Sequence, residues 1–394
     1  MTPVAIAKQI ISASIPPSTA ETRSLADSLG MVLAEPVYSP VDMPPFHQSA
    51  MDGYAFRFED SKQLLRIIGE VQAGVAPGAL TEPGTAMRIF TGAPVPTGAD
   101  TVIMQEKVRI ENNLLYLEDP ELKSGANVRL RASQTAKGAL ALPAGATLSP
   151  AAIGLLAGLG INAVQVWSKP RVALIITGKE LAMPGVALQP GQVYESNSIT
   201  LTAALAEIGL SPALVFRCDD VAEDINNSLQ KALSECEVVL CTGGISVGDY
   251  DLVKAAMEHC GVETGFYKVK QKPGKPLFFG KYAQKRVFGL PGNPGSVLTC
   301  YYEYVEPMLL QMLGKTGDFP RSTQKILAQT LYKKAGLTHF LKGKLDGNMV
   351  WPLHGQESYK MDGFALADCL IVLDEDATEV KQGQMVEVHL VNPL

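Results

Sequence analysis

Between residues 171 and 313, strand-like runs alternate with helical patterns, and this alternation constrains the fold more than any other feature of the sequence. The run RVALIIT at 171–177 is almost wholly apolar, as in a strand buried on both faces. Further strand-like runs are ALVFR at 213–217, EVVLC at 237–241 and RVFGL at 286–290. The expected helices cover 196–209, 220–235, 249–260 and 294–313. Strands and helices in this order predict an α/β domain with a central parallel sheet covered on both faces.

Short strand-like runs separated by glycine and proline lie on both sides of this region and predict two flanking β domains. The runs of the first lie at 64–71, 86–90, 101–110 and 114–118, and those of the second at 325–331, 339–345, 369–373 and 385–390. The stretch PVYSPVDMPP at 36–45 is too rich in proline for a regular helix and is interpreted as a linker. Residues 148–160 are expected to form a helix closed by Gly160. The chain begins with a pattern typical of an amphipathic helix rather than a secretory signal.

The composition argues against several classes of protein. At roughly 150 residues per domain, a chain of 394 residues is expected to hold two to four domains. A formal net charge of -6 argues against nucleic-acid binding, and no apolar run is long enough to span a membrane. None of the six cysteines forms a CxxC pair, and the five histidines show no metal-ligand spacing. Scattered reduced thiols favour a cytoplasmic protein.

Ligands of an open α/β sheet bind outside the carboxyl ends of its strands, and three of these ends carry unusual residues. TGKE places Glu180 just beyond the first strand, CTGGISVGDYD follows the third, and PGNPGS follows RVFGL. Gly243 and Gly244 permit backbone N–H groups to approach an anion closely. The glycine pair is also compatible with a tight turn that binds nothing.

The same edge of the sheet gathers carboxylates, which are Glu180, Asp219, Asp249 and Asp251. Two carboxylates about 5 Å apart repel by about 3 kcal/mol at an effective dielectric of about 20. A partly enclosed cluster therefore needs a cation or a shared proton, and beside a phosphate-holding loop we expect Mg²⁺. The alternative is that Asp249 and Asp251 cap the helix that follows them.

The stretch KVKQKPGKPLFFG at 268–280 combines lysines with prolines. Its lysines are Lys268, Lys270, Lys272 and Lys275. Pro273 and Pro276 fix the backbone, so the stretch is expected to be a stiff cationic loop suited to a compact dianion. The alternative interpretation is a solvated hairpin turn.

These motifs together resemble the molybdopterin molybdenumtransferase family, to which the E domain of gephyrin also belongs. The similar stretches run nearly end to end: PPFHQSAMDGYAFR (44–57), IFTGAPVPTGADTVIMQE (89–106), TGKEL (177–181), GQVYESNS (191–198), CTGGISVGDYDLVK (241–254), KPGKPLFFG (272–280) and GLPGNPGS (289–296). The resemblance implies Mg²⁺-dependent insertion of molybdate into adenylylated molybdopterin, with release of AMP and molybdenum cofactor. Partners would include molybdopterin adenylyltransferase and the enzymes that accept the cofactor.

The resemblance also implies an elongated, L-shaped homodimer of four-domain subunits. The domains would be an N-terminal elongated domain (1–37 with 137–166), a small inserted β domain (38–136), the α/β molybdopterin-binding domain (167–316) and a C-terminal β domain (317–394).

Carried over position by position, the resemblance implies a catalytic set of Asp52, Thr91, Glu180, Asp219 and Asp251. Asp52 and Thr91 would close over the partner subunit's sheet, and Glu180 with Asp251 would hold Mg²⁺. The residues that would bind the pterin nucleotide or the oxyanion are Gly243, Gly244, Ser246 and Asp249 in the GGISVGD loop, Pro273, Gly274 and Lys275 in the PGKP loop, Pro291 and Pro294 in the PGNP loop, and Ser358 with Lys342 in the C-terminal domain.

The chain departs from the family pattern at four positions. Gln134 and His47 each stand where the family usually has an aspartate. Lys179 replaces an acid, and Lys342 replaces an arginine. The amide of Gln134 can neither bind Mg²⁺ strongly nor act as a base, unless another acid such as Glu195 compensates. Lysine at 342 would hold an oxyanion as a point charge rather than as a planar fork.

Three hypotheses follow: an active but divergent enzyme, a non-catalytic pterin-binding or scaffold paralogue, and a molybdopterin adenylyltransferase. The two flanking β domains argue against the last. The sequence leaves open whether molybdate or tungstate is the substrate.

Overall fold

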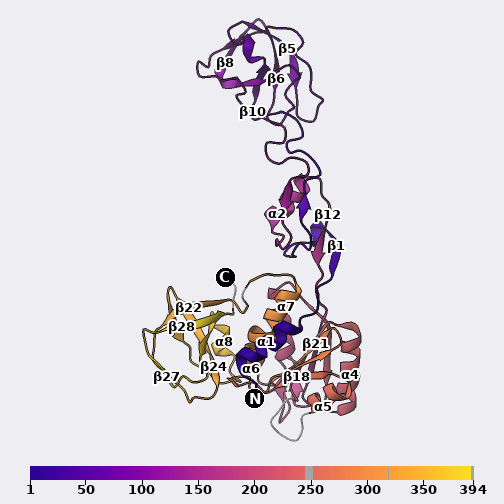
Figure 1. Ribbon diagram of the computed structural model, residues 1–394, viewed down its shortest axis with the longest axis vertical. Coiled ribbons are helices and arrows are strands. Elements are labelled where there is room, and N and C mark those ends of the chain that lie inside the picture. The colour runs from indigo at the N-terminus through magenta and orange to yellow at the C-terminus, as the bar shows by residue number, and fades with distance from the viewer. Residues whose placement is uncertain (245–251, 318, 392–394) are drawn as a thin grey trace. The chain divides into compact units, whose positions relative to one another are not determined.

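The computed structural model of the chain describes residues 1–244, 252–317 and 319–391 (Figure 1). The chain divides into two compact units. Unit 1 comprises Met1–Glu21, Gly30–Val32 and Trp167–Leu394, and unit 2 comprises Thr22–Leu29 and Leu33–Val166. Each unit is described by itself, and the four-domain division expected from the sequence stays a proposal. No helix within the described ranges is long and apolar enough to cross a membrane.

The α/β class is confirmed in unit 1, whose central sheet has six strands. In spatial order they are β16 (Pro212–Cys218), β13 (Val172–Thr177), β17 (Val238–Thr242), β21 (Lys285–Leu290), β20 (Phe278–Tyr282) and β18 (Glu263–Tyr267). The first four run parallel, as predicted. The sheet also contains β20, which was not predicted as a strand and runs antiparallel to both of its neighbours. Only two residues separate β20 from β21, and a connection that short can join only antiparallel strands.

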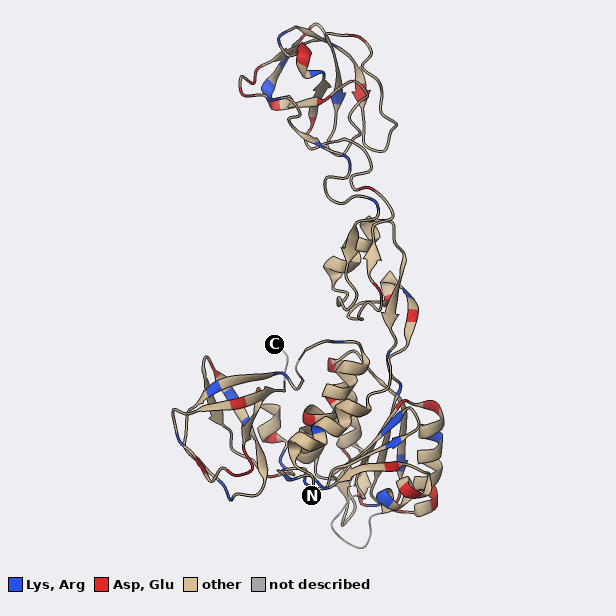
Figure 2. Cartoon of the chain, viewed as in Figure 1, with Lys and Arg blue, Asp and Glu red and all other residues tan. Residues whose placement is uncertain are grey.

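Helices cover both faces of this sheet, as predicted. They are α1 (Val4–Ser14), α3 (Asn197–Glu207), α4 (Ala222–Glu235), α5 (Leu252–His259), α6 (Pro294–Cys300) and α7 (Glu306–Met312). Alternate residues of β13 enter different cores, because successive side chains of a strand point to opposite faces. Leu174 packs in the core that includes α1, α3 and α7, whereas Ile175 packs in the core formed with α4 and α5. Charged residues lie along the outer surfaces of α4 and α5 (Figure 2).

A π-helical segment, Tyr301–Val305, interrupts the helix expected at 294–313 and buries a charged residue within it. Glu303 lies 2.6 Å from Lys8 Nζ of α1 and 2.7 Å from His389 Nδ1 of the C-terminal sheet. Burial opposes ionisation of Glu303, but the charges of Lys8 and His389 outweigh it and lower the pKa. This ionic contact joins three segments that are distant in the sequence.

The short strands predicted after Pro320 are confirmed, and they form most of a six-stranded sheet. Its order is β19 (Gln271–Lys272), β24 (Thr338–Asp346), β25 (Met349–Pro352), β22 (Ser322–Leu327), β28 (Met385–Leu390) and β26 (Cys369–Leu373), and β24 also pairs with β26, so the sheet closes on itself. Smaller elements are β23 (Leu331–Tyr332), paired with β27 (Glu379–Val380), and α8 (Asp362–Ala365). Strand β19 belongs to the lysine-rich stretch, which is therefore bonded into this sheet rather than forming a free hairpin turn.

Unit 2 contains the strands predicted between residues 64 and 118. Its main sheet has the order β7 (Thr101–Met104), β4 (Gly53–Phe56), β6 (Thr85–Ile89), β5 (Leu65–Val71), β9 (Leu114–Leu117) and β8 (Val108–Glu111). The helix α2 (Pro150–Gly158) confirms the helix expected at 148–160, and Gly160 with φ 79° follows it.

Short elements complete the chain. They are β1 (Ala20–Ser24) with β12 (Ala163–Trp167), β2 (Val37–Tyr38) with β11 (Leu140–Leu142), β3 (Gln48–Ser49) with β10 (Val128–Arg129), β14 (Leu181–Ala182) with β15 (Val193–Tyr194), and the 3₁₀ turns η1 (Leu25–Asp27), η2 (Phe58–Asp60) and η3 (Gln105–Lys107). The interpretation of 36–45 as a linker is therefore wrong at Val37–Tyr38, which pair with β11.

Candidate functional site

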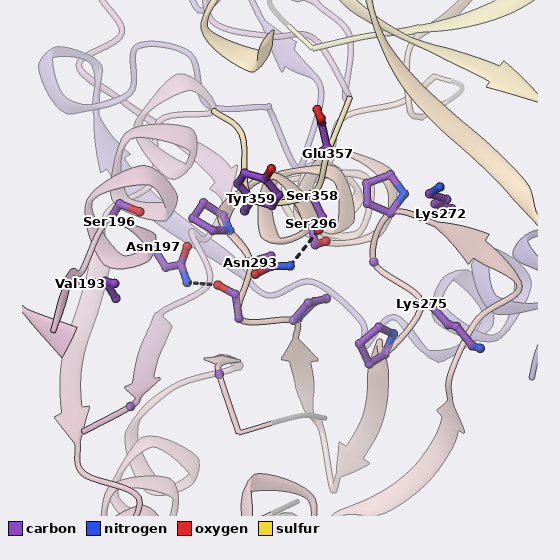
Figure 3. A pocket seen from close by; sticks show the side chains of 18 of the residues that line it. Val193, Ser196, Asn197, Lys272, Lys275, Asn293, Ser296, Glu357, Ser358 and Tyr359 are labelled. Carbon is purple, nitrogen blue, oxygen red and sulfur yellow. Dashed lines mark hydrogen bonds between the residues drawn. The ribbon is translucent and has the colours of Figure 1, made fainter. Parts of the chain in front are cut away.

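A large cavity of about 1950 Å³ opens in unit 1 at the carboxyl ends of β13, β17 and β21 (Figure 3). The described segments that line it include 177–181, 193–197, 243–244, 271–276, 291–294, 339–341 and 353–359. Ligand pockets are commonly about 300–1,000 Å³, so this cavity is large enough for a ligand of nucleotide size or more. It lies where the strand ends predicted a site, and the C-terminal sheet supplies part of its lining.

The glycine pair after β17 allows two backbone segments to pack without intervening side chains. Gly243 has φ 83° and Gly244 has φ 61°. A Cβ added at Gly243 would lie 2.3 Å from the carbonyl oxygen of Thr177, and one at Gly244 would lie 2.6 Å from Val253 Cγ2. The close approach in the described part of this loop is therefore to the end of β13 and to α5. Ser246, Asp249 and Asp251 lie outside the described residues.

Only two of the four predicted carboxylates, Glu180 and Asp219, lie in the described residues. Glu180 is exposed and lines the cavity, whereas Asp219 is exposed and is not among the lining residues, where its neighbour Asp220 is found. Among residues 1–244, 252–317 and 319–391, no group of three or more His, Cys, Asp or Glu side chains could hold a metal ion.

Glu195 is buried, and its carboxylate is hydrogen-bonded within the protein. Its carboxylate accepts hydrogen bonds from the backbone N–H and the hydroxyl of Ser198 and lies 3.9 Å from Arg217 Nε. These contacts make it a fixed part of the start of α3.

Two of the four lysines in the 268–280 stretch line the cavity, Lys272 and Lys275. The other two do not: Lys270 Nζ lies 2.6 Å from Glu375 Oε1, and Lys268 Nζ lies 4.8 Å from the centroid of the Tyr267 ring. The cationic loop is thus confirmed as a feature of the cavity, but with half of the predicted charge.

The PGKP loop is held from beneath by a buried amide. Gln271 is fully buried, donates from Nε2 to the carbonyl oxygen of Gly274 at 3.1 Å, and accepts from the Tyr304 hydroxyl. A Cβ at Gly274 would lie 2.5 Å from Cys300 Sγ. Pro273 and Gly274 line the cavity beside Lys275, so this rigid loop presents its cations from a fixed backbone.

The PGNP loop connects the two parts of the cavity wall (Figure 3). Asn293 Nδ2 donates to Ser358 Oγ at 2.8 Å, and the Gly295 N–H donates to the Ser358 carbonyl oxygen at 2.9 Å. On the other side, Asn197 Nδ2 donates to the Gly292 carbonyl oxygen at 3.0 Å. Pro291 and Pro294 line the cavity, so the structure brings these residues and Ser358 together as the resemblance implied.

Asn197, His339 and His354 are among the polar residues of the lining that sequence reasoning did not identify. Burial, with Lys333 and Lys272 nearby, lowers the pKa of His339 to about 4, so this imidazole is neutral at pH 7. The two histidines have no ligand-like spacing in the sequence, and no local pattern pointed to them. Asn197 lies within the quoted GQVYESNS stretch, which was the available signal.

Lys342 is placed differently from the prediction that it grips an oxyanion. Its side chain is 1% exposed and is not among the described residues that line the cavity. Its ammonium donates to the carbonyl oxygens of Gly355 at 2.5 Å, Lys360 at 2.9 Å and Glu357 at 3.3 Å. An ammonium has three protons, so these contacts leave none for an anion. The oxyanion contact proposed for Lys342 is therefore corrected.

Unit 2 brings the other two predicted catalytic residues together. Asp52 Oδ1 accepts from both the backbone N–H and the hydroxyl of Thr91, each at 2.7 Å. These hydrogen bonds, with the charge of Arg88, lower the pKa of Asp52, so the exposed carboxylate is ionised at neutral pH. A fixed, charged carboxylate can accept hydrogen bonds or contact a cation.

The remaining departures from the family pattern are all surface or loop positions. Gln134 has an exposed side chain, and its backbone N–H donates to Met43. His47 Nδ1 accepts from the Arg131 N–H at 3.2 Å. Lys179 is exposed and lines the cavity next to Glu180.

Comparisons with known proteins agree on one family. Residues 2–160 match the family described as MoeA N-terminal region (domain I and II), residues 173–311 match a probable molybdopterin binding domain, and residues 325–391 match the MoeA C-terminal region (domain IV). A molybdopterin molybdenumtransferase of Haemophilus influenzae is 33% identical over 388 residues, which are 96% of this chain and 95% of that protein. One from a Nostoc species is 38% identical over 295 residues, 72% of this chain and 67% of that protein.

A solved structure gives the same result for the fold. The crystal structure of a molybdopterin biosynthesis moea protein from Pyrococcus horikosii has a TM-score of 0.86 and 32% identity to this chain, and all of both chains is covered.

Proposed function

This chain belongs to the molybdopterin molybdenumtransferase family, and from that premise we propose that it inserts molybdate into adenylylated molybdopterin, releasing AMP and molybdenum cofactor. The observation that carries the proposal is the composition of the cavity wall. Lys272 and Lys275 bring positive charge to the cavity wall on a rigid loop, and the PGNP loop and Ser358 bring polar groups to the same wall. A wall of this kind suits a ligand that carries phosphate and a small oxyanion.

The roles of individual residues follow from their charges. Lys275 and Lys272 would neutralise the oxyanion and the phosphate, which otherwise repel each other. The neutral imidazole of His339 would supply a hydrogen bond without adding charge. Asp52, held in place by the two donors of Thr91, would complete the partner subunit's site as a fixed acceptor.

Magnesium is part of the proposal. Mg²⁺ binds through one or two carboxylates and completes its shell with water and phosphate oxygens. The exposed carboxylate of Glu180 at the cavity fits that donor set, and we propose that Asp251 supplies the second ligand. When bound, the ion would neutralise phosphate charge and make AMP a better leaving group.

The main competing proposal is a paralogue that binds the pterin without inserting metal. Two observations favour it: Gln134 carries no charge, and the ammonium of Lys342 is committed to backbone carbonyls. A molybdopterin adenylyltransferase is the less favoured alternative. The two flanking β domains argue against it, because that activity uses only an α/β domain similar to the one in this chain.

One assay distinguishes these proposals. The purified protein is incubated with adenylylated molybdopterin, molybdate and Mg²⁺, and AMP release and molybdenum cofactor are measured, with Mg²⁺ omitted in a parallel sample. We expect both products only in the complete mixture. Pterin binding without AMP release would exclude the enzyme and leave the paralogue. In a second incubation, with molybdopterin and ATP, adenylylation of molybdopterin would identify the adenylyltransferase.

We also propose that the functional form is a homodimer in the cytoplasm. It would receive its substrate from a molybdopterin adenylyltransferase and deliver the product to cofactor-accepting enzymes. The family resemblance supports these partners, and co-expression of two differently defective subunits tests the dimer.

A further inference from the structure

The loop at residues 353–360 of the C-terminal domain, the 353–360 loop, lines the cavity and is held from behind by one buried lysine. Lys342 Nζ donates to three carbonyl oxygens of this loop, those of Gly355, Glu357 and Lys360. The side chain of Gln356 adds a second attachment, because it accepts from the Lys342 N–H and donates to the Lys342 carbonyl oxygen, each at 2.9 Å. The loop is therefore bound to β24 through both the backbone and the side chain of Lys342.

Among the described residues the buried cation is not ion-paired, although the charges of Asp362 and Glu357 act on it. Within the part of the chain that the structure describes, no carboxylate forms an ion pair with Lys342. Burying an ammonium is costly unless its protons are hydrogen-bonded, and here the carbonyl dipoles alone perform that task. The hydrogen bonds of the Lys342 ammonium are thus made to the carbonyl oxygens of the loop rather than to a carboxylate.

The direction of the carbonyl groups determines the direction of the N–H groups. In a trans peptide the C=O of one residue and the N–H of the next point in opposite directions. Since the carbonyls of Gly355 and Glu357 point at Lys342, the N–H groups of Gln356 and Ser358 point away from it. Lys342 lies behind the loop and the cavity lies in front of it, so these two N–H groups face the cavity side.

The far side of the loop is also fixed in place. The Ser358 hydroxyl accepts a hydrogen bond from the Asn293 side chain (Figure 3). The Ser358 carbonyl oxygen accepts one from the Gly295 N–H at the start of α6. The loop is consequently held between Lys342 and the PGNP loop, with little freedom to turn its donors elsewhere. Backbone N–H groups fixed in this way are a common means of binding anions.

We propose that Lys342 is a positioning residue, which holds the 353–360 loop so that the N–H groups of Gln356 and Ser358 bind a tetrahedral oxyanion in the cavity. The oxyanion is either molybdate or the phosphate of the pterin nucleotide. This inference rests on the proposed function, and it replaces a direct contact of Lys342 with an indirect one.

The direct test observes the two amides in the unaltered protein. Their ¹⁵N–¹H resonances are followed by NMR in deuterated protein while sodium molybdate, AMP, or both are added. We expect both amide resonances to shift. A shift with molybdate alone would identify molybdate as the oxyanion, and a shift with AMP alone would identify the phosphate. If neither amide responds to either compound or to their mixture at saturating concentrations, the proposal is overturned.

The second test uses variants of the lysine. Lys342→Met removes the donors while keeping a long apolar side chain, and it should raise the KM for molybdate, or for the pterin nucleotide if phosphate is bound, by roughly ten- to a hundredfold with little change in kcat. Lys342→Arg keeps donors for the carbonyls and should restore most of the affinity. An unchanged KM for both substrates in a folded Lys342→Met protein would contradict the proposal.

Lys344→Met is the matched control, because Lys344 lies on the same strand and forms an exposed ion pair with Asp368. It should leave both KM values unchanged. If Lys342→Met does not fold, the NMR titration of the unaltered protein still shows whether the amides of Gln356 and Ser358 bind an oxyanion. The titration requires no turnover, so amide shifts without AMP release would disprove the proposed function and retain the oxyanion site.

Discussion

Lys275 and Lys342 show how one residue type serves opposite purposes in this protein. Lys275 lines the cavity on a loop fixed by Gln271, whereas Lys342 is buried and bonded to backbone carbonyls. The position of a lysine in the sequence indicated a cation in both cases. Whether the cation is free for a ligand depends on the contacts around it.

We expect Lys275→Ala to raise the molybdate concentration required for half-maximal AMP release by roughly ten- to a hundredfold, since a charge-assisted hydrogen bond contributes about 1.5–3 kcal/mol. The free energy of unfolding should not change, and urea denaturation checks this. Lys231→Ala, at an exposed position of α4, is the control and should alter neither quantity. Unchanged molybdate dependence in Lys275→Ala would remove that side chain from the site.

Glu306 on α7 provides a pH-dependent test of burial. Burial and the neighbouring Glu207 raise its pKa from 4.5 to about 7, against the opposing charges of Arg321 and Lys315. The folded protein thus binds the proton more tightly than the unfolded chain does. The stabilisation from this group is complete below pH 4.5 and is lost as the pH rises to about 7, a change of at most about 3 kcal/mol.

We therefore expect Glu306→Gln to be more stable than the unaltered protein at pH 8 and no more stable at pH 4.5. The measurement is urea denaturation at both pH values. A difference between the two proteins that does not depend on pH would show that Glu306 titrates normally.

At the scale of elements, the site depends on how closely α6 approaches the 353–360 loop. A Cβ at Gly295 would lie 2.8 Å from the carbonyl oxygen of Ser358, which is backbone and cannot rotate away. We expect Gly295→Ala to separate helix and loop, to lower stability by about 1–3 kcal/mol and to weaken molybdate binding. Urea denaturation and molybdate titration measure the two effects.

Gly154→Ala is the matched control for that substitution. Gly154 is exposed on α2, and nothing lies within 4 Å of an added Cβ. It should stabilise the protein by about 0.5–1 kcal/mol, because alanine loses less conformational entropy than glycine in a helix. If both substitutions behave alike, the contact of Gly295 with Ser358 has no special importance.

At the scale of the whole molecule, the proposed homodimer predicts complementation between defective subunits. If Asp52 acts on the partner's cavity, Asp52→Asn and Lys275→Ala each impair a different half of the same composite site when activity is assayed at a molybdate concentration well below the half-maximal value. A dimer with one subunit of each kind then contains one intact site. Random assortment gives such dimers in half of the population, so co-expression should restore about a quarter of the activity.

The same experiment has a clear negative outcome. If Asp52 and Lys275 act within one subunit, every site in every dimer has one defect, and co-expression restores nothing. Each variant expressed alone is the control, and sedimentation or light scattering establishes that the variants still associate.

Much of the architecture could be predicted from the sequence because it depends on local and periodic signals. Apolar runs such as 171–177 specified buried strands, and the periodic helices between them required coverage of both faces. Glycines 243 and 244 were expected to let backbone N–H groups approach an anion, and this stays a prediction; in the described residues an added Cβ would meet Thr177 of β13 and Val253. The PGKP, PGNP and Ser358 stretches were expected at one site and lie at one cavity.

What the sequence alone did not determine depends on contacts between distant segments. The antiparallel β20, the neutral state of His339 and the burial of Lys342 each result from neighbours far along the chain. Local pattern records which groups a segment carries and which face they share. The protonation of a group, its burial and the direction of its hydrogen bonds depend on the packing around it, and that packing exists only after the chain has folded.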